Sequence, residues 1–181
     1  IAFAKKLAKK LKVDITVDYD MFGTALIPHP DLEIEVASAR KEEYKADSRK
    51  PVVTHTTVEE DMSRRDFTIN AIAASLWESD FGKLYDPFNG VKDLNAKKII
   101  TPLDPDNTFS DDPLRMMRAC RFSAQLEFEI SPETLKSISD QAHRIDIISK
   151  ERITEEIIKT LKSEIPSIGF YRLKEVGLLK F

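Results

Sequence analysis

Three arginines at three-residue intervals are the side chains in this sequence best suited to binding an anion. Arg115, Arg118 and Arg121 follow Pro113, and proline at a first helical position predicts that a helix starts there. That spacing would place the three guanidiniums on one helix face, within an arc of about 120°. Guanidiniums bind phosphates or base edges through paired hydrogen bonds, and Asp112, beside the helix N-terminus, would stay ionised as an acceptor. The pattern indicates an anion-binding face, with a solvated arginine face as the alternative.

A second charged cluster, SRRDFTINA, precedes an apolar segment. Arg64 and Arg65 could bind an anionic ligand at the start of a helix. Asp66 could accept a hydrogen bond from a ribose hydroxyl, and Asn70 follows one turn later. The alternative is that Asp66 is only an acid in the first turn of that helix.

Acidic and apolar side chains alternate over residues 32–37. This alternation predicts a half-buried strand with Glu33 and Glu35 on one face. Short apolar or β-branched runs at 13–17 and 24–27 predict two further strands, and apolar residues at helical spacing predict a helix over 1–11. A small sheet with a helix is therefore expected at the start of the chain.

The next segments predict a loop, a helix and a turn. Residues 41–62 are polar and have no regular period, which indicates a loop. Apolar spacing after Arg64 predicts a helix that ends before Asp80. Asn89-Gly90 is a strong turn signal, so a second hairpin or loop is expected there.

Helix signals dominate after residue 101. Pro113 and Pro132 each follow a capping residue, and Gly177 is placed to end a final helix. The expected helices cover about 113–125, 131–143, 149–161 and 167–176. The fold class is therefore α+β, with a small mixed sheet and helices over 1–105 and an all-helical part over 106–181.

Composition limits the class of protein. The chain has 181 residues, 41% of them hydrophobic and 33% charged, which predicts a globular protein and excludes disordered and collagen-like chains. Its apolar runs are too short for a membrane span. Because the formal net charge is −3, any contact with nucleic acid must come from a local basic patch.

The single cysteine and the first residues bear on the cellular compartment. Cys120 has no partner for an internal disulfide, so we expect a reducing, cytoplasmic environment. The lysine-rich start lacks the apolar core of a signal peptide. Because the chain opens on Ile1, we expect it to be a fragment of a longer protein.

Four sequence blocks stand in the order in which they occur in one known family. The blocks are SRRDFTINA, DPFNGVKDL, DDPLRMMRACRF and ERITEEIIK, preceded by FGTAL and LEIEVASAR. Together they resemble the class II tRNA nucleotidyltransferases and bacterial poly(A) polymerases, over about residues 22–181. The resemblance implies a polymerase-beta-like nucleotidyltransferase head followed by an all-helical neck.

The resemblance also implies a role for each matching residue. The RRD block of the family holds the ribose and phosphates of the incoming nucleotide, and it maps onto Arg64, Arg65 and Asp66, with Asn70 beside them. Asp112 and Arg115 match the block that pairs with the Watson-Crick edge of CTP or ATP. Arg118 and Arg121 would contact the nucleotide further along the same face.

Such a protein template would select bases without a nucleic-acid template. Asp112 would accept from the exocyclic amine that cytosine and adenine share, and Arg115 would donate to ring acceptors. Uracil and guanine present a carbonyl there, which would leave the carboxylate unpaired at a cost of roughly 1–3 kcal/mol. Asp111 stands where the family has glutamate, a departure that keeps the charge.

The two remaining blocks imply mechanical roles. DPFNGVKDL is a hinge strand in the family, and the helix of ERITEEI packs behind the template helix. Asp111, Glu151 and Arg152 would then support the template residues from behind. For Glu151 and Arg152 an ordinary helix start is the alternative.

The family's reaction needs two divalent metals held by carboxylates, for which Mg²⁺ is the expected ion. The family's principal ligands, an Asp-x-Asp after a Gly-Gly turn, have no match in the first residues, so we expect that strand to be missing from this chain. Asp18-Tyr19-Asp20 is interpreted as a decoy because FGTAL follows it. Glu35 is the candidate catalytic acid and metal ligand, with a solvent-facing glutamate as the alternative.

The resemblance implies template-independent transfer of CMP and AMP, from CTP and ATP, to the 3′ end of tRNA. Without the Asp-x-Asp, the chain alone is expected to be inactive or nearly so. Three alternatives stay open: a poly(A) polymerase or an enzyme that adds only A or CC, a nucleotide- or RNA-binding module without catalysis, and a structural helical adaptor. No membrane partner is expected.

Overall fold

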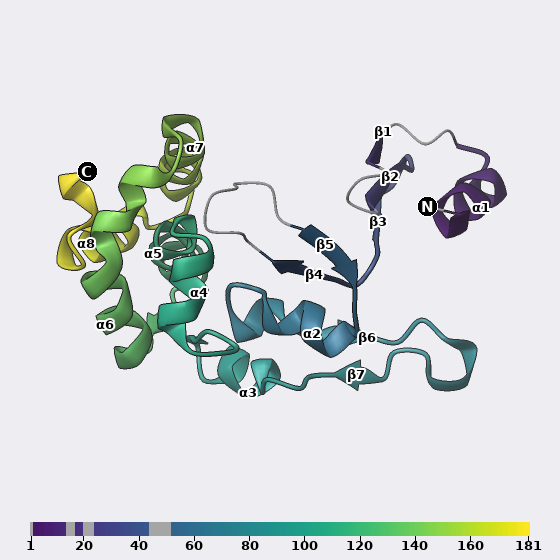
Figure 1. Ribbon diagram of the computed structural model, residues 1–181, viewed down its shortest axis with the longest axis horizontal. Helices are drawn as coiled ribbons and strands as arrows, with labels where there is room; N and C mark the ends of the chain where they lie inside the picture. Colours follow the sequence, from purple (N-terminus) through teal and green to yellow (C-terminus); the bar gives the residue numbers. More distant parts are fainter. Residues whose placement is uncertain (1, 14–16, 20–23, 44–51) are drawn as a thin grey trace. The chain divides into compact units, whose positions relative to one another are not determined.

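The computed structural model describes residues 2–13, 17–19, 24–43 and 52–181. The chain packs into two compact units, Ile1–Asp61 and Met62–Phe181, which can be followed by residue number in the colours of Figure 1. The expected division near residue 105, between a head and a neck, stays a prediction. Helices and small sheets occur together, so the α+β class is confirmed.

The first unit begins with a helix and a three-stranded antiparallel sheet. Its elements are α1 (Ala2–Leu11), β1 (Val17–Tyr19), β2 (Thr24–Pro28) and β3 (Glu33–Ala37), and the strand order is β1-β2-β3. Ala4 and Ala8 of α1 are buried with Ala25 and Ile27 of β2. Apolar spacing along α1 therefore predicted the buried face, although Phe3 is 66% exposed.

The prediction of a loop over 41–62 is wrong for the residues that the structure describes. An antiparallel hairpin of β4 (Arg40–Glu43) and β5 (Val52–His55) is followed by α2 (Val58–Ser63). The sequence pattern that would indicate strands is weak in this polar stretch, because the two strands are short and carry few apolar residues.

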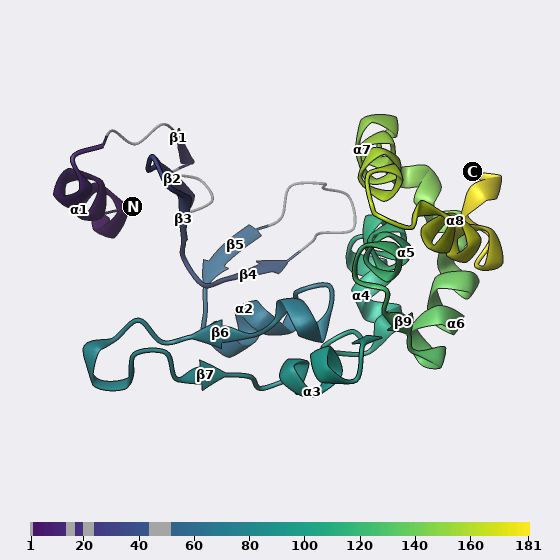
Figure 2. The same cartoon turned by 180° about the vertical axis from the view of Figure 1, so that it is seen from behind.

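The helix expected after Arg64 is also wrong. In its place stand a 3₁₀ turn (Thr68–Asn70) and two short antiparallel strands. Strand β6 (Ala73–Ala74) pairs with β7 (Leu84–Tyr85) (Figure 2). The amide N–H of Thr68 donates to the carbonyl of Ile100 at 2.8 Å. A hydrogen bond to a distant segment thus replaces one that a helix would have made locally.

Asn89-Gly90 begins a helix and not a hairpin. Asn89 has a positive φ of 59°, and α3 (Gly90–Asn95) follows it. Both oxygens of the Asp86 carboxylate cap this helix, accepting from the N–H of Gly90 at 2.6 Å and of Val91 at 2.9 Å. The turn signal was correct about the local conformation and wrong about the element that follows.

The four expected helices are confirmed, with boundaries shifted by a few residues. They are α5 (Leu114–Leu126), α6 (Pro132–Gln141), α7 (Lys150–Leu161) and α8 (Pro166–Glu175). The α6 N-terminus is capped by Ser131, and Gly177 follows α8 with a φ of 79°. An unpredicted helix, α4 (Pro105–Asp111), precedes them, and β8 (Lys98–Ile99) pairs in parallel with β9 (Glu129–Ile130).

Helix α5 lies at the centre of the second unit and contacts α4, α7 and α8 (Figure 1). Met116, Ala119 and Cys120 on α5 are fully buried with Phe67 and Phe109. Burial of these side chains fixes the rotation of α5 and so decides where its arginines lie. None of the described helices is both long and apolar enough to cross a membrane.

Candidate functional site

A cavity of about 530 Å³ brings together the two charged clusters of the sequence. Its lining residues are Arg64, Arg65, Asp66, Asn70, Asp112, Leu114, Arg115, Arg118, Phe122 and Arg152. All of them belong to the second unit. Because arginines outnumber aspartates five to two, the cavity attracts an anionic ligand.

Asp66 is the most constrained acid of the cavity, with a side chain only 8% exposed. Its Oδ1 accepts from the N–H of Phe67 at 2.9 Å and from Nδ2 of Asn70 at 3.0 Å. Its Oδ2 accepts from Nε of Arg118 at 2.8 Å, and Nη2 of the same guanidinium forms an ion pair with it at 2.6 Å. Asp66 thereby links helix α5 to the segment of chain that follows α2.

Arg115 also ties separate segments together. Its Nη2 donates to the carbonyl of Arg64 at 2.7 Å, and its Nη1 donates to the carbonyl of Thr108 in α4 at 3.3 Å. A guanidinium has five donors, so these two bonds leave others for a ligand. The contact with Arg64 places Arg115 beside the RRD segment.

Asp112 has partners on both carboxylate oxygens. Oδ1 accepts from the N–H of Leu114 at 3.1 Å and caps α5, as the sequence predicted for an acid before Pro113. Oδ2 accepts from Nη2 of Arg152 at 2.9 Å. Arg152 thus contacts Asp112 directly, as its expected supporting role requires.

Arg64 and Arg65 lie on the cavity wall beside Asn70. The Arg65 side chain is exposed, and its Nη1 donates to the backbone carbonyl of Asn70 at 3.1 Å. Arg64 is half-buried. Arg65 thus stands at the solvent side of the cavity, and both cations line the wall where a phosphate group could bind.

Phe122 is a lining residue that sequence reasoning missed. Its ring meets Phe67 edge to face, with centroids 5.8 Å apart, and the Arg118 guanidinium carbon lies 5.3 Å from its centroid. The available signal was its position four residues after Arg118, one helical turn along the predicted face. The aromatic ring gives this otherwise charged cavity an apolar surface.

Arg121 is not among the lining residues, although the sequence placed it on one face with Arg115 and Arg118. Its side chain is buried, and Nε donates to Oε2 of Glu156 in α7 at 2.6 Å. Nη1 also bonds to Gln125. Each three-residue step falls about 60° short of a full helical turn, so the third arginine is rotated away from the first.

Three further acids from the sequence analysis lie outside the cavity lining. Asp111 and Glu151 are exposed. Glu35 is exposed on β3, opposite Leu26 in the register with β2, and belongs to the first unit. Asp18 is in β1, but the position of its side chain and the whole of Asp20 fall outside the described residues, so the decoy interpretation stays a prediction.

Among the residues described, no three His, Cys, Asp or Glu side chains are close enough to hold a metal ion. Glu35 therefore has no partner acids there with which to form a two-metal centre, and these residues do not fit one. Its assignment as a catalytic acid and metal ligand stays a prediction.

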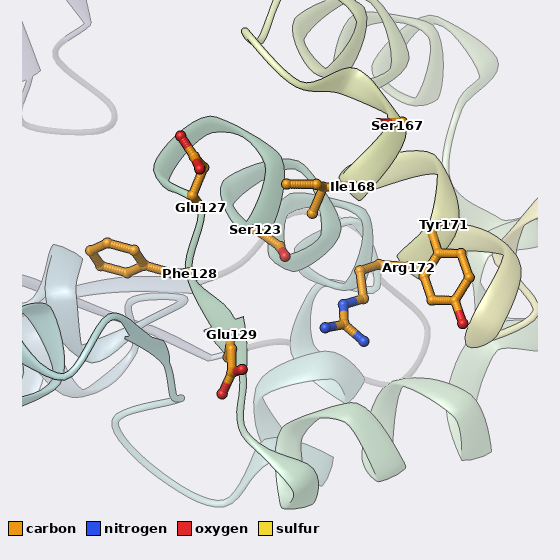
Figure 3. A pocket seen from close by; sticks show the side chains of 8 residues that line it. All are labelled: Ser123, Glu127, Phe128, Glu129, Ser167, Ile168, Tyr171 and Arg172. Carbon is orange, nitrogen blue, oxygen red and sulfur yellow. The ribbon is translucent and has the colours of Figure 1, made fainter.

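A second cavity, of about 550 Å³, lies between the end of α5, β9 and α8 (Figure 3). Arg172 points into it, but Arg172 is paired with Glu175 at 2.7 Å, and Glu127 and Glu129 stand at its edge. This lining offers a phosphate no excess positive charge, in contrast to the arginine cavity. The sequence analysis selected none of its residues.

Comparison with known proteins places these observations in a family. A family described as "Poly A polymerase head domain" matches residues 1–100, and one described as "Probable RNA and SrmB- binding site of polymerase A" matches 127–181. A CCA-adding enzyme of Anoxybacillus flavithermus is 38% identical over 161 residues, which cover 88% of this chain and 40% of that enzyme. The chain thus spans less than half the length of this relative.

Two further proteins show the same relationship. An A-adding tRNA nucleotidyltransferase of Geobacter sulfurreducens is 34% identical over 184 residues, covering 100% of this chain and 21% of that protein. A solved structure of a tRNA-processing enzyme with CTP has a TM-score of 0.86 and 31% identity, covering 99% of this chain and 46% of that one. With the head-domain match over more than half of its residues, the chain belongs to the family of class II tRNA nucleotidyltransferases and bacterial poly(A) polymerases.

Proposed function

We propose that this chain is part of a template-independent nucleotidyltransferase that adds CMP and AMP, from CTP and ATP, to the 3′ end of tRNA. The arginine cavity carries the proposal, because it combines an excess of arginines with two carboxylate acceptors in one place. The relative from Anoxybacillus flavithermus is named a CCA-adding enzyme, and the related solved structure is described with CTP.

Asp112 and Arg115 are proposed to read the base. The Asp112 carboxylate accepts from an N–H and from a guanidinium, and these two contacts fix its orientation. An ionised carboxylate can only accept, so it favours the amines of cytosine and adenine over the carbonyls of uracil and guanine. Arg115, held by two carbonyls, would donate to the ring acceptors.

Arg64, Arg65 and Arg118 are proposed to bind the phosphates. Their guanidiniums lie on the wall of the same cavity, and Phe122 would contact the apolar face of the nucleotide. Arg121 has no such position, since it is buried against Glu156. For this chain a structural role of Arg121 is better supported than a contact with the nucleotide.

The proposed reaction transfers one nucleotidyl group. The RNA 3′-hydroxyl oxygen forms a bond to the α-phosphorus and loses its proton to water, the bond from that phosphorus to the bridging oxygen breaks, and pyrophosphate leaves. The family relationship implies a divalent metal, which we propose to be Mg²⁺ because triphosphates and carboxylates offer hard oxygen ligands. No step is assigned to Glu35.

Three other proposals concern the protein as a whole. Residues 106–181 are proposed to form a helical neck that follows, along the chain, a head at 1–105. RNA would be held mainly through its backbone and shape. The buried, unpaired Cys120 is compatible with a reducing cytoplasm.

Incorporation of labelled nucleotides tests the proposal. The protein is offered CTP and ATP, separately and together, with Mg²⁺ and either a tRNA lacking its CCA end or an unrelated RNA. Incorporation of two C and one A on the tRNA alone supports CCA addition. Nucleotide binding that is lost on Arg115→Ala, without incorporation, would instead support a binding module.

A-only addition is the second candidate, because an A-adding relative matches the full chain at 34% identity. The same assay separates the two candidates. An enzyme that adds only A incorporates ATP into a tRNA ending in CC and does not extend a tRNA that lacks both C residues. Long A tracts on unrelated RNA would point to a poly(A) polymerase.

A further inference from the structure

The second cavity, beside α8, contains a buried hydroxyl without a partner. Ser123 of α5 lines this cavity of about 550 Å³ and is only 1% exposed. Among the residues that the structure describes, none forms a hydrogen bond with its Oγ. Figure 3 shows this oxygen pointing into the space that the Arg172 guanidinium also enters. Because a buried hydroxyl without a hydrogen bond lowers stability, the arrangement indicates a ligand that supplies the missing bond.

Arg172 adds hydrogen-bond donors to the same space. Its Nη1 donates to Oε2 of Glu175 at 2.7 Å, and this bond uses one of the five donors of the guanidinium. The side chain is 28% exposed, and its ion pair with Glu175 holds it at the cavity wall. A ligand with acceptor atoms can therefore bond to both Ser123 and Arg172.

The remaining walls of the α8 cavity are apolar or aromatic. Phe128 and Ile168 are half-buried there, and Tyr171 is 66% exposed. Aromatic side chains favour planar rings, which stack on them. Because Tyr171 is already exposed, its ring can contact a ligand without any rearrangement of the core.

The charges of this cavity disfavour a phosphate. Glu127 and Glu129 stand at its edge, against the single guanidinium of Arg172 (Figure 3). A phosphate would be repelled by the two carboxylates, whereas a neutral ring would not. A neutral, planar ring with N–H donors and ring acceptors is a nucleobase. Proteins that recognise single-stranded RNA bind bases turned out of the strand by such stacking and hydrogen bonding.

From these observations we propose that the α8 cavity binds one unpaired base of an RNA strand. The ring lies against Tyr171 and Phe128, and Ser123 and Arg172 donate to its acceptor atoms. The proposal rests on the proposed function, since it takes RNA as the substrate. None of the residues that line this cavity lines the arginine cavity. The α8 cavity is therefore a site for a base of the RNA substrate and not for the incoming nucleotide.

The experiment compares two labelled probes, pentaadenylate RNA and an abasic pentamer with the same number of phosphates. Fluorescence anisotropy gives both dissociation constants, with saturating CTP and no Mg²⁺, so that the arginine cavity is filled and no transfer occurs. The unmodified protein should bind pentaadenylate about 10-fold more tightly, the usual effect of one stacked base. Tyr171→Ala should weaken binding of pentaadenylate by about the same factor and leave binding of the abasic probe unchanged.

Two further variants separate a base contact from charge and from folding. Arg172→Gln should weaken pentaadenylate more than the abasic probe, whereas Lys174→Gln, an exposed loss of charge in the same helix, should affect both probes equally. Ser123→Ala should weaken pentaadenylate by about 3- to 10-fold. The same change should raise the midpoint of thermal unfolding, because it removes an unpaired hydroxyl from a helix interior.

Equal affinity of the unmodified protein for the two probes would overturn the proposal. So would a Ser123→Ala variant that is less stable and binds pentaadenylate normally, because the hydroxyl would then have only a structural role. Free adenosine that binds as tightly as pentaadenylate would show a nucleoside site and not an RNA site. Absence of CTP binding, measured without RNA, counts against the proposed function alone, because the Tyr171→Ala comparison stands in either case.

Discussion

Arg152 of α7 holds the carboxylate of Asp112, with Nη2 2.9 Å from Oδ2, while the other oxygen caps α5 at the N–H of Leu114. A residue proposed to read the base is thereby fixed from two directions. A carboxylate held in this way accepts hydrogen bonds and cannot donate one to a carbonyl. Selection of bases that carry an amine thus depends on a second helix as well as on α5.

Substitution of Arg152 should therefore weaken base selection. For Arg152→Ala we expect the ratio of kcat/KM for CTP to that for UTP to fall by about 3- to 10-fold, the effect of one charge-assisted hydrogen bond at a half-exposed site. Lys150→Ala, an exposed change in the same helix, is the matched control. A ratio that is unchanged in Arg152→Ala would contradict this role.

The ion pair of Arg121 and Glu156 predicts a loss of stability and not of selectivity. The two side chains are 8% and 3% exposed and 2.6 Å apart, so Glu156→Ala leaves a buried guanidinium without its partner. We expect the free energy of unfolding to fall by about 3–5 kcal/mol, measured by urea denaturation.

A double variant provides the control for this pair. Arg121→Met with Glu156→Leu replaces both charges by apolar side chains of similar length, which should restore most of the lost stability. Equal destabilisation by the single and double variants would show that the loss comes from packing and not from the unpaired charge.

Local signals predicted the helical part of the fold well. Pro113, Ser131 and Gly177 act within one turn of the helix that each begins or ends, so their effect can be read without tertiary information. Segment 64–80 was mispredicted because Thr68 bonds to Ile100, a distant residue that no local pattern reveals. Tertiary contacts there outweigh the helical spacing of the apolar residues.

The candidate site shows the same difference between what local residue types predict and what tertiary contacts decide. Residue types predicted that Arg115 and Arg118 bind an anion, and the structure places both on one cavity. Whether Arg121 joins them depends on how α5 is rotated against α7, which the spacing of arginines alone does not determine. The engagement of Asp66 by Arg118 likewise depends on two segments meeting in space.

Gly90 is expected to tolerate no side chain. A Cβ at this position would lie 2.2 Å from the carbonyl oxygen of Thr68, a backbone atom that cannot rotate away. Gly→Ala within a helix usually stabilises by about 1 kcal/mol, so a loss of about 1–3 kcal/mol for Gly90→Ala would reverse the normal sign. Thermal unfolding measures the change, with exposed Lys92→Ala in the same helix as control.

Cys120 gives a prediction about pH. Burial raises the pKa of its thiol from 9.0 to about 12, so the folded protein should react with thiol reagents at pH 8 only as fast as it unfolds. In the unfolded chain the thiol ionises near its ordinary pKa, and the unfolded state then holds fewer protons than the folded state. Stability must therefore fall as the pH rises above about 9, by at most about 1.4 kcal/mol per pH unit for this group.

The contribution of the thiol can be isolated by difference, because lysines and tyrosines also titrate at high pH. Urea denaturation of the unmodified protein and of Cys120→Ala is compared at pH 8, 9 and 10. The variant is less stable at pH 8 because it loses a buried side chain, but it lacks the thiol that ionises on unfolding. The stability gap between the two proteins should therefore narrow by about 1 kcal/mol from pH 9 to pH 10, and a constant gap would mean that the thiol has the same pKa in both states.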